Sequence, residues 1–315
     1  MSKMERQLPQ LGGGLFLTDG GLETTLIFHD GIELPHFAAF VLLRDEAGRD
    51  MLRRYYERYI AIARDNGFGF ILESPTWRAS ADWGRKLGYS ETDIAAANEQ
   101  AIRLMAELMD RHRSERLPMV VSGCIGPRGD GYVAEEIMTP APAAGYHMLQ
   151  AAALARAGVD MISAITMTNA DEAIGIVRAA VAVDLPVVIS FTVETDGRLP
   201  TGQTLRDAIA AVDVATEAAP AYYMINCAHP SHFDGVLIES QAWTRRVRGL
   251  RANASCRSHQ ELNELPDLDA GDPVAFGREH AALLRRLPRL AVLGGCCGTD
   301  HRHVEQISQA CLQAA

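Results

Sequence analysis

Two adjacent cysteines in a glycine-rich turn are the residues of this chain best suited to chemistry. Cys296 and Cys297 lie in residues 293–299, directly after a short apolar run. Neighbouring cysteines are poor disulfide partners but good metal ligands when a third soft ligand reaches them. We expect Cys227, which follows Asn226, to be that ligand. Three thiolates suit Zn²⁺ and leave its fourth tetrahedral position open, as in a catalytic zinc site.

Other interpretations of these residues are open. A lone cysteine is usually a packing residue, which is the expectation for Cys124, Cys256 and Cys311 and also for Cys227 when it is considered alone. A glycine-rich loop after a last strand could instead cradle a phosphate, although two thiols pointing into the loop disfavour that. The surrounding glycines would let the backbone aim two consecutive side chains inward; they are Gly294, Gly295 and Gly298.

The elements that must position the cysteines alternate along the whole chain. Eight apolar runs are each followed by an Ala- and charge-rich stretch with helical spacing, and such runs suit parallel strands covered on both faces. We predict strands at 14–19, 68–73, 119–123, 159–165, 186–193, 221–227, 249–254 and 290–294. We predict helices at 46–66, 91–112, 141–157, 171–183, 205–218, 233–246, 273–287 and 300–312.

Eight strand–helix pairs in 315 residues predict an α/β fold of the (β/α)₈ TIM-barrel type. We expect one domain over residues 1–315, with the polar stretch 253–272 as a lid or surface excursion. A doubly wound open sheet is the alternative. No GxGxxG follows the first predicted strand, which removes the commonest dinucleotide-binding version of that sheet.

Composition limits the classes of function. The chain is 48% hydrophobic and 22% charged, so it can bury a large core, and its net charge of −10 disfavours nucleic acid and anionic membranes as partners. No apolar signal region opens the sequence, and no run reaches the roughly 18 apolar residues of a membrane helix. We therefore expect a cytoplasmic protein with reduced cysteines and small-molecule partners, and we leave homo-oligomerisation open.

The residues suited to chemistry follow the predicted strands. In a TIM barrel the site forms at the carboxyl ends of the strands, and the ends of strands 6 and 8 are close around the closed barrel. The three cysteines can therefore converge on one point. The other strand-end residues of interest are Asp19, Gly20 and Gly21 after strand 1, Glu73 after strand 2 and Asn226 after strand 6.

These motifs resemble those of the homocysteine S-methyltransferase family. Its members carry an N-terminal DGG motif, an Asn-Cys at strand 6 and a GGCCGT-type motif at strand 8, which stand here at 19–21, 226–227 and 294–299. Segments 122–127 (SGCIGP) and 75–80 (PTWRAS) are similar to the family's segments after strands 3 and 2. The resemblance spans nearly the whole chain.

The resemblance implies a zinc-dependent S-methyltransferase of methionine biosynthesis. Homocysteine's sulfur would take the open zinc position, where the metal deprotonates it, and the thiolate is the nucleophile. It would displace a neutral leaving group from a methyl-sulfonium or methyl-ammonium compound. The chain ends shortly after the barrel, so we expect a diffusible donor such as S-methylmethionine, S-adenosylmethionine or betaine.

The resemblance also suggests how homocysteine is held. Asp19 would bind its amino group and backbone N–H groups near Gly20 and Gly21 its carboxylate, although Asp19 could equally be a turn cap. Many family members carry a Glu at the end of strand 4, where this chain has Ile165. Glu73 is our candidate for the replacement acid.

Secondary candidates surround these residues. Glu194 on strand 5 is a weaker replacement acid, and His229 is the histidine expected nearest the cysteines. Trp77 and Trp83 would hold the donor cation on their ring faces, with core or lid packing as the alternative.

Other functions are compatible with the same barrel. Ile165 leaves room for a different thiol acceptor, or for a non-catalytic zinc or thiol sensor. A phosphate-ligand aldolase or lyase would need a Schiff-base lysine or a metal-binding carboxylate pair at a strand end. Lys3 and Lys86 lie outside the predicted strands, which disfavours that function.

Overall fold

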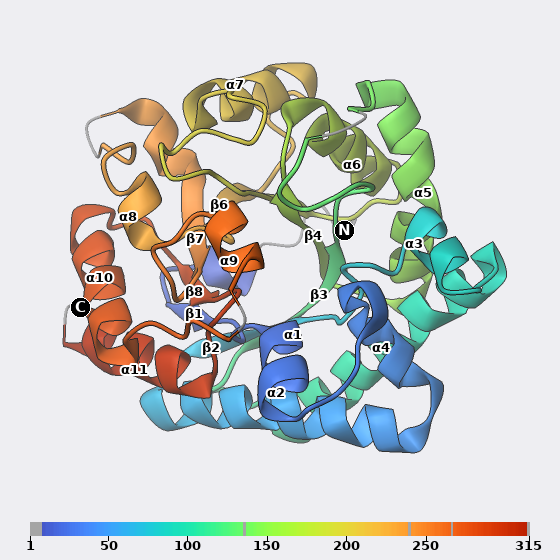
Figure 1. The fold of residues 1–315 in the computed structure, drawn as a ribbon, viewed down its shortest axis with the longest axis horizontal. Coiled ribbons are helices and arrows are strands. Elements are labelled where there is room, and N and C mark those ends of the chain that lie inside the picture. Colours follow the sequence, from blue (N-terminus) through green and yellow to red (C-terminus); the bar gives the residue numbers. More distant parts are fainter. Residues whose placement is uncertain (1–7, 135–136, 239–240, 266, 314–315) are drawn as a thin grey trace.

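A computed structural model of the chain describes residues 8–134, 137–238, 241–265 and 267–313. Eight strands pair in parallel in chain order and close between the first and the last, with the helices as a ring around them (Figure 1). The strands are β1 (Phe16–Leu17), β2 (Gly69–Glu73), β3 (Met119–Ile125), β4 (Met161–Met167), β5 (Val187–Phe191), β6 (Tyr222–Asn226), β7 (Val247–Ala252) and β8 (Val292–Gly295). The predicted TIM barrel is confirmed, and the open sheet is excluded.

Buried apolar side chains cover both faces of the strands, which is why the strand sequences are apolar almost throughout. Every residue of β4 is buried, for example. Inside the barrel a cluster that includes Phe16, Val120 and Met224 packs around the axis. Between the strands and the helices lies a larger cluster.

Seven long helices follow the predicted positions. They are α2 (Glu46–Asn66), α4 (Glu91–His112), α5 (Pro140–Ala157), α6 (Ala170–Ala182), α7 (Leu205–Ala215), α10 (Pro273–Arg286) and α11 (His301–Leu312). Local signals set their ends: Asp45 and Ser90 accept hydrogen bonds from the first turns of α2 and α4, and Gly67 ends α2 in a left-handed conformation. None of the helices in the described ranges is long and apolar enough to cross a membrane.

The predicted helix at 233–246 is wrong. A short α8 (Pro230–Phe233) and a 3₁₀ helix η6 (Ala242–Arg246) stand there, while residues 239–240 lie outside the described ranges. Gly235 and the β-branched Val236 and Ile238 have low helix propensity, which disfavours a continuous helix.

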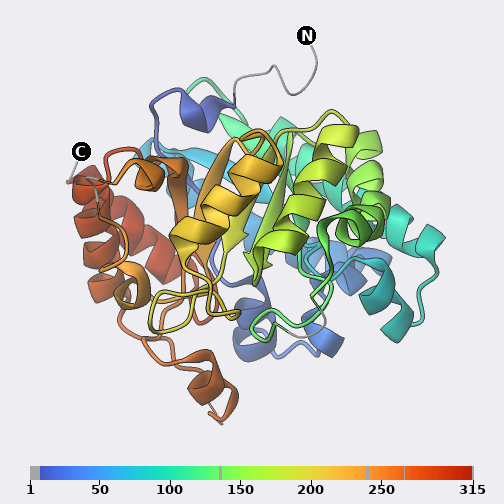
Figure 2. The same cartoon turned by 90° about the horizontal axis from the view of Figure 1, so that it is seen from above.

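Short helices extend the loops beyond the strands. The sequence did not predict α1 (Leu22–Thr24), η3 (Thr25–His29), η2 (Pro9–Leu11), η4 (Pro35–Phe37), η5 (Ala39–Arg44), α3 (Ala81–Lys86) and α9 (His259–Asn263). Figure 2 shows the segment that carries α9 projecting from the body of the barrel. This segment falls within the polar stretch 253–272, of which residue 266 is outside the described ranges.

Two glycines let β8 fit closely between its neighbours. A Cβ added at Gly294 would overlap Thr18 Oγ1 just after β1, and one added at Gly295 would overlap Thr299 Oγ1. Of the three glycines that we expected to turn the backbone, only Gly298 has a positive φ, of 79°. Gly294 and Gly295 are therefore needed for close packing and not for a left-handed turn.

This packing predicts that Gly294→Ala lowers the free energy of unfolding by about 1–3 kcal/mol, because the added methyl group has no space. Gly145→Ala is the matched control, since a Cβ at Gly145 of α5 meets nothing within 4 Å. It should raise stability by about 0.5–1 kcal/mol, as alanine favours a helix. Urea unfolding of both variants measures the difference, and equal stabilities would contradict the close fit at Gly294.

Candidate functional site

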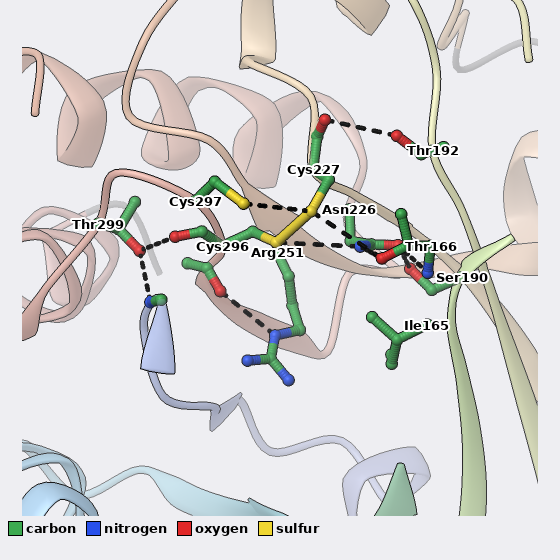
Figure 3. The surroundings of a disulfide bond; sticks show 12 residues. Ile165, Thr166, Ser190, Thr192, Asn226, Cys227, Arg251, Cys296, Cys297 and Thr299 are labelled. Atoms are coloured by element: carbon green, nitrogen blue, oxygen red, sulfur yellow. Dashed lines mark hydrogen bonds between the residues drawn. A yellow bond between two sulfur atoms is a disulfide. The ribbon is translucent and has the colours of Figure 1, made fainter. Parts of the chain in front are cut away.

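The structure brings Cys227, Cys296 and Cys297 together. Cys227 follows β6 and the other two follow β8, and their three Sγ atoms lie within 4.8 Å of one another. Cys227 and Cys296 form a disulfide, and Cys297 Sγ lies 3.8 Å from Cys227 Sγ (Figure 3). The disulfide differs from our expectation that all six cysteines are reduced.

The three thiols fit a zinc ion once the disulfide is reduced. Tetrahedral Zn–S bonds of about 2.3 Å place neighbouring sulfur atoms about 3.8 Å apart. The spacing of Cys227 and Cys297 matches this value. A reduced cluster therefore offers three soft ligands, whereas the disulfide withdraws Cys227 and Cys296 from coordination.

Asn226 holds the backbone around the cluster. Its Oδ1 accepts hydrogen bonds from the Thr166 N–H (2.9 Å) and the Ser190 hydroxyl (2.6 Å), and its Nδ2 donates to Thr166 Oγ1 (2.8 Å). Thr166 and Cys227 both adopt positive φ values, of 66° and 52°. Such strain persists only where the surroundings enforce it, and the buried amide supplies that constraint. Asn226 is thus placed to position the cysteine beside it.

The loop after β8 is bound to the loop after β1. The Gly21 N–H donates to Thr299, and the Gly298 N–H donates to Thr24 Oγ1 at 3.0 Å. Thr299 Oγ1 in turn donates to the Cys296 carbonyl at 2.7 Å. We expected backbone N–H groups near Gly20 and Gly21 to bind a substrate carboxylate, but the Gly21 N–H is used within the protein.

Two residues that the sequence did not single out cover the thiols. The Tyr132 hydroxyl lies 3.1 Å from Cys297 Sγ and 3.7 Å from Cys227 Sγ. The Tyr132 ring stacks on His259 of α9 at 4.1 Å, and His259 is hydrogen-bonded to the Cys227 carbonyl. The expected histidine, His229, instead contacts Ser231 beside it. Only the contact between distant loops identifies Tyr132 and His259.

A buried ion network lies in the same cavity. Arg251 of β7 donates from Nη2 to Asp19 Oδ1 at 2.6 Å, and its Nη1 lies 3.5 Å from Glu73 Oε2. Asp19 Oδ2 accepts a hydrogen bond from the Tyr55 hydroxyl at 3.0 Å. Both carboxylate oxygens of Asp19 are therefore engaged by the protein. Arg251 was not predicted, although it is the one arginine of the predicted strand 249–254, which is a signal that could have identified it.

Glu73 has one oxygen without a partner. Its side chain is buried, and Oε1 accepts no hydrogen bond from the described residues. Burial raises the pKa of Glu73 to about 7, against the opposing effect of Arg251. Burial likewise raises the pKa of Asp19, although Arg251 and Tyr55 lower it. A carboxyl group with this environment attracts a cation or an N–H donor.

The cavity that joins the thiols to this network has a volume of about 340 Å³. Six carboxyl groups line it against two arginines and His259, and Ile165 of β4 lines it too. The weaker candidate acid, Glu194, is paired with His259 (3.2 Å) and is not among the lining residues. An acidic cavity of this size fits a small cationic or zwitterionic molecule.

Cationic side chains of the chain itself lie over the rings of Trp77 and Trp83, which we expected to hold the donor. The Arg78 guanidinium lies 3.9 Å from the Trp77 ring centre and 3.8 Å from that of Trp83, and Lys86 also lies over Trp83. Trp77 lines the cavity, and its Nε1 donates to the Ile165 carbonyl at 3.2 Å. Trp83 is buried and is not among the lining residues, in keeping with the packing alternative.

Comparison with known proteins places this geometry in context. The sequence model of a family described as homocysteine S-methyltransferase matches residues 16–311. The chain is 24% identical to "Homocysteine S-methyltransferase 4" of Zea mays, over 96% of the chain and 91% of that protein. Its fold is similar to that of the homocysteine methyltransferase MmuM of Escherichia coli. The crystal structure of the oxidized form has a TM-score of 0.72 at 19% sequence identity, and the match covers 94% of this chain and 95% of that chain. The metallated form has a TM-score of 0.72 at 17% identity, and the match covers 94% of this chain and 96% of that chain.

The thiol cluster predicts that reduced protein loaded with zinc retains about one zinc per chain, as three thiolates bind it tightly. Cys297→Ala should lose most of this zinc while remaining folded. Cys256→Ser is the control, because Cys256 is exposed and lies outside the cluster. Metal analysis after gel filtration measures the content. Equal zinc in both variants, or none in the wild type, would rule out the site.

The raised pKa of Glu73 predicts how stability depends on pH. The folded chain binds this proton more tightly than the unfolded chain, whose Glu has a pKa near 4.5. The contribution of Glu73 is therefore fully present below pH 4.5 and is lost as pH rises through about 7. As the pH rises from 5 to 8, the free energy of unfolding of the wild type should fall by about 2–3 kcal/mol relative to that of Glu73→Gln.

Urea unfolding at the two pH values tests this expectation. The exposed Glu115 provides the control, as Glu115→Gln should follow the wild type at both. Parallel pH profiles of wild type and Glu73→Gln would show that Glu73 ionises normally.

Proposed function

Because this chain belongs to the homocysteine S-methyltransferase family, we propose that it methylates the thiol of homocysteine at the three-cysteine cluster, giving methionine. The family makes it a methyltransferase enzyme. The observation that supports the site is the convergence of Cys227, Cys296 and Cys297 at the ends of β6 and β8. A cluster of three thiols beside a cavity that fits a small molecule is what thiol activation requires.

The reduced cysteines would hold the metal. Bound Zn²⁺ supplies the acidity that converts an acceptor thiol into a thiolate at neutral pH. Asn226 keeps the backbone of Cys227 in position, and Thr299 does the same for Cys296 through its carbonyl. Tyr132 and His259 cover the cluster and keep water from it, with the stretch 253–272 acting as a lid.

The ion network would recognise the amino acid part of homocysteine. Glu73 binds the ammonium group through its unpartnered Oε1, in place of an acid at Ile165. Arg251 faces the carboxylate through Nη1, while Asp19 fixes the guanidinium from the other side. In this proposal Asp19 positions Arg251, with which it is in contact, whereas the sequence analysis expected Asp19 to bind the amino group.

The donor would be a methyl-sulfonium or methyl-ammonium compound: S-methylmethionine, S-adenosylmethionine or betaine. Trp77 forms part of the wall on the donor side. The acidic lining of the cavity favours such cationic donors over neutral ones.

A second candidate is methyl transfer to a thiol that lacks an ammonium group. The observation that favours it is Ile165, which is 6% exposed and presents an apolar surface to the cavity. Glu73, if protonated, would then be a hydrogen-bond donor to the acceptor.

Methyl transfer assays decide between these functions. Reduced, zinc-loaded protein is mixed with each of the three donors and either homocysteine or 4-mercaptobutanoate, which has the same skeleton without the ammonium. We expect methionine from at least one donor, a homocysteine preference of at least about tenfold, and loss of turnover in Cys297→Ala.

Mass spectrometry of the products gives the result. A preference for 4-mercaptobutanoate would favour the second candidate. No methylated thiol from any pair, with zinc bound and the chain folded, would refute both and favour a non-catalytic sensor.

A further inference from the structure

We propose that Glu23 is the counter-charge that binds the positive charge of the methyl donor beside the thiols. The proposal rests on the proposed function, and it adds a donor-binding residue that no motif in the sequence indicated. Glu23 belongs to α1, directly after Asp19-Gly20-Gly21, and its side chain lines the cavity.

The position of Glu23 is set by the loop that carries the cysteines. Its neighbour Thr24 accepts the hydrogen bond from the Gly298 N–H at 3.0 Å, which fastens α1 to residues 296–299. Cys297 lines the same cavity as Glu23. Asp19 and Arg251 of the ion network line this cavity too. Glu23 therefore shares one cavity with the thiols and the ion network.

The Glu23 carboxylate has no ion pair with any side chain in the described part of the chain. The two arginines that line the cavity are engaged by other groups. Arg251 binds Asp19 at 2.6 Å, and Arg78 donates to the Gly129 carbonyl at 2.8 Å while stacking on Trp77. Burial raises the pKa of Glu23 to about 7, so a bound cation would draw it into the charged form.

Unpartnered atoms of neighbouring residues show that the cavity is built for a ligand with positive charge or N–H groups. Glu73 is 5% exposed and Asn253 2% exposed, and both line the cavity. Glu73 Oε1 and Asn253 Oδ1 accept no hydrogen bond from the described residues. Buried acceptors normally have partners, and no arginine or lysine of the chain reaches these two atoms among the described contacts.

The alternative, in which the ring face of Trp77 binds the donor cation, is weaker in this cavity. Trp77 carries the Arg78 guanidinium 3.9 Å above its ring, and a second cation close to it would be repelled. An onium group near the thiols thus has a carboxylate available, whereas the indole already interacts with a cation of the chain.

The chemistry gives Glu23 a specific kinetic role. The acceptor thiolate forms a bond to the methyl carbon while the bond from that carbon to the donor sulfur or nitrogen breaks. The electron pair of that bond stays on the donor atom, which becomes neutral, so the two opposite charges disappear together. Glu23 therefore stabilises the bound donor more than the transition state, and contributes to donor affinity rather than to the rate of the chemical step.

Donor binding without acceptor tests the proposal, because no methyl transfer can occur. Calorimetric titration of reduced, zinc-loaded protein compares S-methylmethionine with methionine, its neutral counterpart, and adds S-adenosylmethionine and betaine. We expect the wild type to favour S-methylmethionine over methionine by at least about tenfold, and Glu23→Gln to lose that preference. Glu23→Asp retains the charge and should keep most of it.

Glu33→Gln is the matched control, since Glu33 is exposed, lies ten residues further along and is not among the lining residues. Thermal melting verifies that each variant is folded. In steady-state assays Glu23→Gln should raise the donor KM at least about tenfold with kcat equal to or above that of the wild type.

An unchanged preference in folded Glu23→Gln, or no binding of any onium compound to the wild type, overturns the proposal. A fall in kcat at constant donor KM does so too, because that would assign Glu23 to the chemical step. A different result would show that the proposed function fails while the role of Glu23 holds. In that case onium compounds would bind in a Glu23-dependent manner, yet no acceptor would be methylated.

Discussion

The pairing of the first strand with the last is the constraint on which this structure depends. β1 pairs with β8 through Phe16 and Leu17, and the absence of a side chain at Gly294 leaves the space that Thr18 needs. Closure brings the loop after β1 against the cysteine loop, where Gly21 and Gly298 donate hydrogen bonds across the junction. Residues from opposite ends of the chain thereby form one wall of the cavity.

Electrostatics divides the cavity into two parts. At one end three sulfur atoms lie together, and Asn226 constrains the backbone beside them in an unfavourable conformation. At the other end Arg251 is buried between Asp19 and Glu73, because a buried cation without partners would cost far more than it contributes. Burial raises the pKa of the carboxyl groups of Glu23 and Glu73, which keeps them responsive to a cation that enters.

In the proposed function, the acceptor end of the cavity combines an apolar residue with buried charged residues. Ile165 of β4 stands where the family resemblance predicts an acid, and Glu73 of β2 places a buried carboxylate in the same cavity. Arg251 of β7 lines the cavity as well, and the lining as a whole is acidic.

The sequence by itself determined the barrel and the thiol cluster. Strands buried on both faces are apolar throughout, and the caps of α2 and α4 are local, so their boundaries were predicted correctly, whereas the helix at 233–246 was not. Cys227 and the Cys296–Cys297 pair could be combined because a closed barrel brings strand ends together. Only the tertiary structure decided the partners: Arg251 meets Asp19 across 232 residues of chain, and Tyr132 meets His259 between two loops. Such contacts depend on side-chain directions that no periodicity or spacing encodes, and for that reason the contact of Asp19 with Arg251 was not predicted.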